Sequence, residues 1–197
     1  MRELTSDLFI SLDGFASGVD QAPYFGCDGH EIGSWVRDHL GQPQLIIMGR
    51  VTYVALAQFS ASVTDELSVR MSALPKLVFS RTLKEPLAWK NTRLLNGAVG
   101  DEIRVLKQQR GDPLRSIGSI SLVKSMMRLG LVDRLRLMIF PLSLAELVGS
   151  PSMLAIHKRA SNLSIRQFWT RGSSISNTVL CPGQPVSAYV GRLATES

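Results

Sequence analysis

The residues best suited to binding a charged ligand lie where an apolar strand, expected at about 114–118, meets Gly118 and Ser119 and a helix begins at once. The first N–H groups of a helix have no acceptor within it, and the helix dipole adds partial positive charge there. A glycine at this junction lets a phosphate approach the backbone closely, because it has no Cβ. The segment indicates an anion site; the alternative is an ordinary βαβ crossover that binds nothing.

The residues after this junction predict how the crossover continues. Leu122, Met126 and Leu129 fall on one face of a helix expected over 119–129. Gly130 then predicts a left-handed stop, with Leu131 placed to fold back on the last turn. A second strand is expected over 133–140, and its apolar run predicts burial on both faces.

Two further short apolar runs also end in small, basic and hydroxyl residues. Leu45–Met48 is followed by Gly49, Arg50 and Thr52, and Leu77–Phe79 by Ser80 and Arg81. Parallel strands with such residues at their carboxyl ends describe the crevice where open α/β sheets bind nucleotides. A solvated surface charge is the alternative for either arginine alone. Together they suggest a phosphorylated cofactor, because arginine pairs bidentately with phosphate.

Five motifs in a fixed order carry a family resemblance over roughly residues 4–145. They resemble the dihydrofolate reductase-like proteins related to the reductase (C-terminal) domain of the bacterial riboflavin-biosynthesis deaminase-reductase. No single motif is specific, and the order and spacing of the five carry the resemblance. The motifs are Ser11-Leu12-Asp13-Gly14, Met48-Gly49-Arg50-x-Thr52-Tyr53, Val78-Phe79-Ser80-Arg81, Gly118-Ser119-x-Ser121-Leu122-Val123 and Gly130-Leu131-Val132-Asp133.

The resemblance implies an α/β fold, a mostly parallel sheet flanked by helices, with NADPH as the cofactor. It places Asp13 in the loop that approaches the nicotinamide and the substrate, so Asp13 is the candidate catalytic residue. Ile120 stands where the family often has a second glycine. By position, the cofactor phosphates would meet Gly49, Arg50 and Thr52, the adenosine 2′-phosphate would meet Ser80 and Arg81, and the pyrophosphate would meet Gly118, Ser119, Ile120 and Ser121.

The chain departs from this pattern after Pro141, so we expect a reductase domain over 1–145 and an atypical tail over 146–197. Residues 151–197 hold five Lys and Arg and one Glu, which places +4 of the net charge of +6 there. We interpret the segment as either a divergent basic tail or the product of a changed reading frame. Without its family's terminal strands, the strand over 135–140 would become an apolar edge that recruits other chains.

Composition excludes several other classes. No apolar run reaches the roughly 18 residues that span a bilayer, and the three histidines have no metal-ligand spacing. Cys27 and Cys181 suggest free thiols rather than a disulfide framework, so we expect a cytoplasmic protein without a signal peptide. The pI near 9.7 is typical of proteins that bind nucleic acid. However, Lys107, Arg110 and Arg115 are expected in scattered turns, and the chain has no nucleic-acid-binding motif.

The remaining elements are expected as strands at about 7–12, 44–48, 76–80 and 93–96 and helices at about 30–40, 51–57, 65–73 and 100–110. We therefore predict an NADPH-dependent reductase that transfers hydride to a small pterin-, pyrimidine- or carbonyl-type substrate, as a homodimer without metal, nucleic-acid or membrane partners. The alternative is a non-catalytic nucleotide-binding or dimerisation module that has lost turnover. A third hypothesis is a nucleic-acid binder driven by the basic tail.

Overall fold

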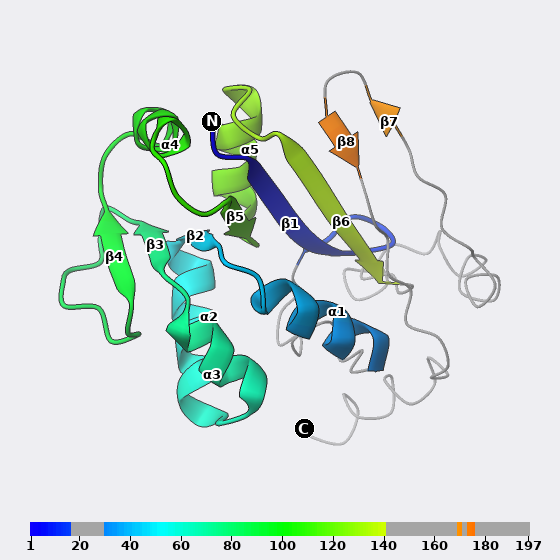
Figure 1. Ribbon diagram of the computed structural model, residues 1–197, viewed down its shortest axis with the longest axis vertical. Coiled ribbons are helices and arrows are strands. Elements are labelled where there is room, and N and C mark those ends of the chain that lie inside the picture. Colours follow the sequence, from blue (N-terminus) through cyan, green and yellow to red (C-terminus); the bar gives the residue numbers. More distant parts are fainter. Residues whose placement is uncertain (17–29, 141–168, 171–172, 176–197) are drawn as a thin grey trace, which may run out of the picture.

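The computed structural model describes residues 1–16, 30–140, 169–170 and 173–175 (Figure 1). Strands and helices alternate along most of this part of the chain. The strands are β1 (Leu4–Ser11), β2 (Leu45–Gly49), β3 (Lys76–Phe79), β4 (Thr92–Leu95), β5 (Leu114–Ile117), β6 (Arg134–Phe140), β7 (Trp169–Thr170) and β8 (Ser173–Ile175). The helices are α1 (His30–Leu40), α2 (Arg50–Ser62), α3 (Glu66–Ala73), α4 (Val99–Gln108) and α5 (Ile120–Arg128).

One sheet holds all these strands, in the order β4-β3-β2-β5-β1-β6-β8-β7. Every neighbouring pair from β4 to β8 is parallel, and only β7 and β8 are antiparallel. The pairing of β1 with β5 begins with Leu4 opposite Leu114. The pairing of β1 with β6 begins with Thr5 opposite Arg134. The predicted α/β fold with a mostly parallel sheet is confirmed.

Helices cover both faces of the sheet, with α1, α2 and α3 on one face and α4 and α5 on the other (Figure 1). The strands β1, β2, β3, β5 and β6 therefore each contribute to two apolar cores. On β2, Ile46 and Met48 join the core beneath α1–α3, whereas Ile47 points to the core beneath α4 and α5. Because neighbouring strand residues face opposite sides, burial on both faces produces the continuous apolar run seen in the sequence.

The strand order reverses direction between β2 and β5. The chain leaves β2 through α2 and α3 to reach β3 on one side, and leaves β5 through α5 to reach β6 on the other. Right-handed crossovers in opposite directions place their helices on opposite faces, as observed. The carboxyl ends of β2 and β5 therefore form a topological switch point, where open α/β sheets bind their ligands.

The end of α5 confirms the predicted glycine stop. Gly130 has a φ of 64°, in the left-handed region. The N–H groups of Gly130 and Leu131 donate to the carbonyls of Met127 and Met126, both at 3.0 Å. Leu131 is buried in the same core as Met126. The chain thus closes α5 with a Schellman motif and enters β6 in a fixed direction.

Three element predictions differ from the structure. β1 begins at Leu4 rather than near residue 7, and α2 continues to Ser62 rather than ending near 57. The prediction that the strand over 133–140 is buried on both faces is wrong, because only Met138 and Phe140 are buried there. The expected domain boundary at 145 lies outside the described residues, and so do Cys27 and Cys181.

Candidate cofactor-binding site

The predicted phosphate-binding residues lie at one edge of the sheet. Gly49 ends β2 and is the N-cap of α2, while Gly118 and Ser119 join β5 to α5. Since β2 and β5 are parallel neighbours, the N-termini of α2 and α5 meet at the switch point. Two sets of free N–H groups and two helix dipoles thus converge on one spot, an arrangement that attracts anions.

A hydrogen-bonded chain joins the two helix starts directly. The backbone N–H of Gly49 donates to Ser119 Oγ at 2.7 Å, and Ser119 Oγ donates to Thr52 Oγ1 at 2.7 Å. A Cβ on Gly118 would lie 3.3 Å from Thr52 Cγ2, and one on Gly49 would lie 3.3 Å from Ser119 Oγ. The two glycines therefore permit the close approach of the two turns.

The backbone at the start of α5 is left-handed at two successive residues. Gly118 has a φ of 56° and Ser119 a φ of 61°. Ile120 is the first residue of α5, so the left-handed turn does not involve the β-branched side chain. Ile120 and Ser121 are both exposed on the first helical turn, where their N–H groups lack acceptors within the helix.

Ser80 and Arg81 follow β3, next to β2 in the sheet. They line an open hollow of about 250 Å³, together with Asn96 and Gly97 after β4. Ser80 Oγ accepts from the N–H groups of Thr82 and Leu83 at 3.1 and 3.0 Å, which fixes this turn. Arg81 is exposed beside the hollow, so its guanidinium is accessible to a ligand on the same sheet edge.

Asp13 lies in a tight turn at the carboxyl end of β1. Ser11 is completely buried, and its hydroxyl donates to Asp13 Oδ1. The same hydroxyl accepts from the N–H of Phe15 at 3.0 Å, and the N–H of Gly14 donates to the Ser11 carbonyl at 2.9 Å. The turn therefore fixes the Asp13 carboxylate at the sheet edge that also holds the phosphate-binding candidates.

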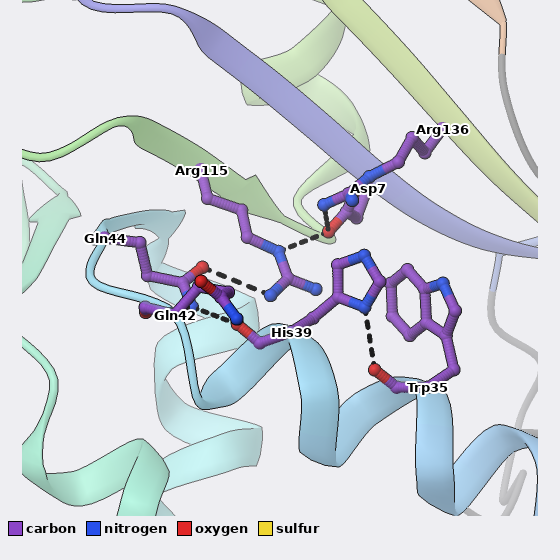
Figure 2. Close-up of polar contacts among 7 residues, drawn as sticks. All are labelled: Asp7, Trp35, His39, Gln42, Gln44, Arg115 and Arg136. Atoms are coloured by element: carbon purple, nitrogen blue, oxygen red, sulfur yellow. Dashed lines mark hydrogen bonds and ion pairs between the residues drawn. The ribbon is translucent and has the colours of Figure 1, made fainter.

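A buried charged cluster lies beneath α1, and the sequence analysis missed it (Figure 2). Asp7 on β1 is 2% exposed and accepts from Arg115 on β5 and Arg136 on β6. Arg115 also donates to Gln44 Oε1 at 3.1 Å. The expectation that Arg115 lies in a turn is wrong, because Arg115 lies in β5, within the strand predicted over 114–118. Its position three residues before Gly118, within that predicted strand, was the available signal.

The C-terminal half of α1 covers this cluster. The His39 ring stacks on Trp35 with centroids 3.8 Å apart, and the guanidinium carbons of Arg115 and Arg136 each lie 5.3 Å from the Trp35 ring centre. Burial lowers the pKa of His39, and the two guanidiniums lower it further, against opposing effects of the Trp35 carbonyl and Asp7. The cluster therefore favours a neutral His39.

Lys107 and Asp133 form a second link that sequence patterning did not identify. Lys107 is buried in α4, and its ammonium donates to Asp133 Oδ2 and to the Leu131 carbonyl. Asp133 Oδ2 also accepts from the N–H of Leu4 at 2.7 Å. The expectation that Lys107 lies in a turn is wrong, because Lys107 lies in α4, which matches the helix predicted over 100–110. This ion pair joins α4 to the amino-terminal ends of β1 and β6.

The described ranges hold neither a cluster of metal ligands nor a helix able to span a membrane. Across 1–16, 30–140 and the short strands at 169–175, no three His, Cys, Asp or Glu side chains come together as a metal site would require. The helices of the same part of the chain are all too short or too polar to cross a membrane.

Comparison with known proteins identifies the family. The model of the RibD C-terminal domain matches residues 2–175. The chain belongs to the RibD C-terminal domain family. The match continues past residue 145, where the sequence resemblance was expected to end. The reading frame, the domain boundary, the homodimer and the cytoplasmic location remain predictions.

Relatives of this RibD C-terminal domain protein include the uncharacterised protein YyaP of Bacillus subtilis (strain 168). It is 29% identical over 183 residues, which cover 90% of this chain and 94% of YyaP. A crystal structure of a "Putative riboflavin biosynthesis protein" from Shewanella sp. PV-4 has a TM-score of 0.58 at 18% identity, covering 74% of this chain and 80% of the other. At that identity, the structural likeness supports the fold.

Proposed function

We propose that this chain is an NADPH-dependent reductase that transfers hydride to a small pterin-, pyrimidine- or carbonyl-type substrate. The observation that carries the proposal is the meeting of two helix N-termini at the switch point, in a chain of the RibD C-terminal domain family. The cofactor supplies the hydride when bound. The work of the chain is to bind, orient and enclose the reactants.

The phosphates of NADPH are assigned to the α2–α5 junction. The first turns of both helices supply N–H donors, and Thr52 supplies a hydroxyl. Arg50 opens α2 and is exposed, so its guanidinium can approach a bound phosphate. The residues assigned to this junction are Gly49, Arg50, Thr52, Gly118, Ser119, Ile120 and Ser121.

Ser80 and Arg81 are assigned to the 2′-phosphate that distinguishes NADPH from NADH. Their support is the hollow at the ends of β3 and β4, on the same sheet edge as the α2–α5 junction. A guanidinium binds a terminal phosphate through two parallel hydrogen bonds, whereas a ribose hydroxyl offers no comparable partner. This assignment therefore predicts a preference for NADPH.

Asp13 is assigned to the substrate side of the reaction. Its carboxylate lies at the end of β1, hydrogen-bonded to the buried Ser11 hydroxyl. Hydride transfer to a C=N or C=O group requires a proton at the heteroatom, and Asp13 would deliver it directly or through water. Asp13→Asn should therefore reduce kcat while leaving the Kd for NADPH within about twofold, since it removes the proton donor alone.

Turnover assays test the proposal. Absorbance would follow NADPH oxidation with pterin, flavin and ribosylaminopyrimidine substrates, with Asp13→Asn as the matched variant. Turnover that falls in the variant supports the reductase. Tight NADPH binding without turnover on any substrate would favour the alternative of a non-catalytic nucleotide-binding module, and absence of binding would contradict both.

A further inference from the structure

The hydrogen bonds at the α2–α5 junction have a fixed direction. A backbone N–H can only donate, so Ser119 Oγ must accept from Gly49. Ser119 Oγ in turn donates its single hydrogen to Thr52 Oγ1, 2.7 Å away. Thr52 Oγ1 is thereby occupied as an acceptor, and its own hydrogen is left to point elsewhere.

Thr52 could in principle donate back to a carbonyl of its own helix, as threonine often does. Among the described residues, the only hydrogen bond of the Thr52 hydroxyl is the one it accepts from Ser119. Thr52 lies in the first turn of α2, next to the N–H groups that lack helical acceptors. Its hydroxyl hydrogen therefore belongs to the same set of donors as those N–H groups.

Ser119 maintains this arrangement in an unfavourable conformation. It is the N-cap of α5, yet its side chain makes no capping bond to its own helix. Its φ of 61° lies in the left-handed region, which non-glycine residues rarely adopt because it is strained. The hydroxyl contacts residues 70 and 67 positions away instead. A side chain that served only the local turn would require neither contact.

We propose that Ser119 is a positioning residue that aligns the Thr52 hydroxyl as a hydrogen-bond donor to a pyrophosphate oxygen at the α2–α5 junction. This inference rests on the proposed NADPH function. Ser119 acts through Thr52 and does not itself donate to the phosphate. The ligand chemistry is a diphosphate, whose oxygens are strong acceptors for a hydroxyl and for helix N–H groups.

The test compares Ser119→Gly, Thr52→Val and the double variant by calorimetric titration with NADPH and with 2′-AMP, which lacks the diphosphate. Each single variant is expected to weaken NADPH binding about tenfold, which is the effect of losing one hydrogen bond to a charged group. The double variant should lose no more affinity for NADPH than Thr52→Val alone, and all three variants should bind 2′-AMP as the wild type does. Independent, multiplying losses would overturn the positioning role.

Controls separate this role from a general effect on folding. Ser119→Gly removes two hydrogen bonds but relieves the left-handed strain, so its unfolding midpoint should stay within about 3 °C of wild type. Ser125→Ala, on the same helix, removes only a hydroxyl that donates to the Ser121 carbonyl and should leave NADPH binding unchanged. Equal weakening by Ser125→Ala would overturn the proposal.

Inorganic pyrophosphate distinguishes failure of this inference from failure of the proposed function. If the wild type binds pyrophosphate but not NADPH, the reductase proposal fails, and the same variants test Ser119 with pyrophosphate as the probe. A wild type that binds NADPH, with no loss in Ser119→Gly, overturns the Ser119 inference alone. A wild type that binds neither ligand overturns both.

Discussion

Asp7 and Arg136 lie directly opposite each other on β1 and β6, and their side chains form a two-point ion pair. Arg136 Nε donates to Asp7 Oδ1 at 2.6 Å, and Nη2 donates to Oδ2 at 2.9 Å. Arg115 approaches the same carboxylate from β5. One buried acid thus joins three neighbouring strands and neutralises part of the charge of two guanidiniums beneath α1.

Asp7→Asn should therefore destabilise the fold strongly. It leaves two guanidiniums close together with no carboxylate between them, and breaking a buried ion pair typically costs about 3–5 kcal/mol. Urea unfolding at neutral pH measures the change. Glu3→Gln is the matched control, because Glu3 and Arg134 join the same pair of strands through an exposed contact. The control should lose less than about 1 kcal/mol of unfolding free energy. Equal losses in the two variants would contradict this account of the cluster.

Lys76 predicts a specific dependence of stability on pH. Its ammonium is buried, donates to the carbonyls of Met71, Ser72 and Leu74 at 2.7–3.0 Å, and lies 4.7 Å from the Trp89 ring centre. Burial, with a smaller effect of Lys90, lowers the pKa of Lys76 to about 8 from 10.5. Between these values the unfolded chain binds more protons, so stability rises with pH.

Comparison with Lys76→Met isolates this effect. The free energy of unfolding of the wild type, minus that of the variant, should rise from pH 8 to pH 10 by about 1.4 kcal/mol per pH unit. Below pH 8 the difference should be constant. A difference that is flat across the whole range would show that Lys76 keeps its ordinary pKa in the folded protein.

His39 should titrate below an ordinary histidine. Burial and the two nearby guanidiniums lower its pKa, so the unfolded chain binds a proton first as pH falls. The contribution of His39 to the free energy of unfolding is therefore complete above pH 6.5, the ordinary pKa of histidine, and is lost as the pH falls through the lower pKa of the folded state. NMR titration of the His39 ring measures the shift, with the chain unfolded in urea as the reference. A midpoint at or above the reference would contradict the cluster's effect.

Gly118→Ala and Gly130→Ala separate backbone strain from ligand binding. Both glycines are left-handed, with φ of 56° and 64°, so each alanine should cost roughly 1–2 kcal/mol. A Cβ at Gly118 would lie 3.3 Å from Thr52 Cγ2, whereas none of the surrounding atoms lies within 4 Å of one at Gly130. Only Gly118→Ala should therefore also weaken NADPH binding. Equal NADPH affinity in the two variants would contradict the assigned junction.

The local elements could be predicted because their signals lie close together in the sequence. The run into Gly118, the stop at Gly130 and the short apolar run of β2 each depend on a few neighbouring residues. The motif order also brought Gly49, Thr52, Gly118 and Ser119 to one place. No local pattern showed that the Ser119 hydroxyl contacts residues 67 and 70 positions away.

The charged cluster could not be predicted for a similar reason. Asp7, Arg115 and Arg136 meet only when β1 lies between β5 and β6 in one particular register. Their sequence neighbours resemble those of surface charges. Two arginines on β6 explain why this strand is less buried than its apolar run predicted, since Arg134 and Arg136 alternate with Leu135 and Leu137.

Titration of the wild type and Arg81→Ala with NADPH and NADH tests the central claim most directly. The wild type should bind NADPH with a Kd below 1 mM, and at least about tenfold tighter than NADH, because one charged contact to the 2′-phosphate is worth that factor. Arg81→Ala should bind the two cofactors equally, with its NADH affinity unchanged. Equal binding of NADPH and NADH by the wild type, or binding of neither below 1 mM, would contradict the account.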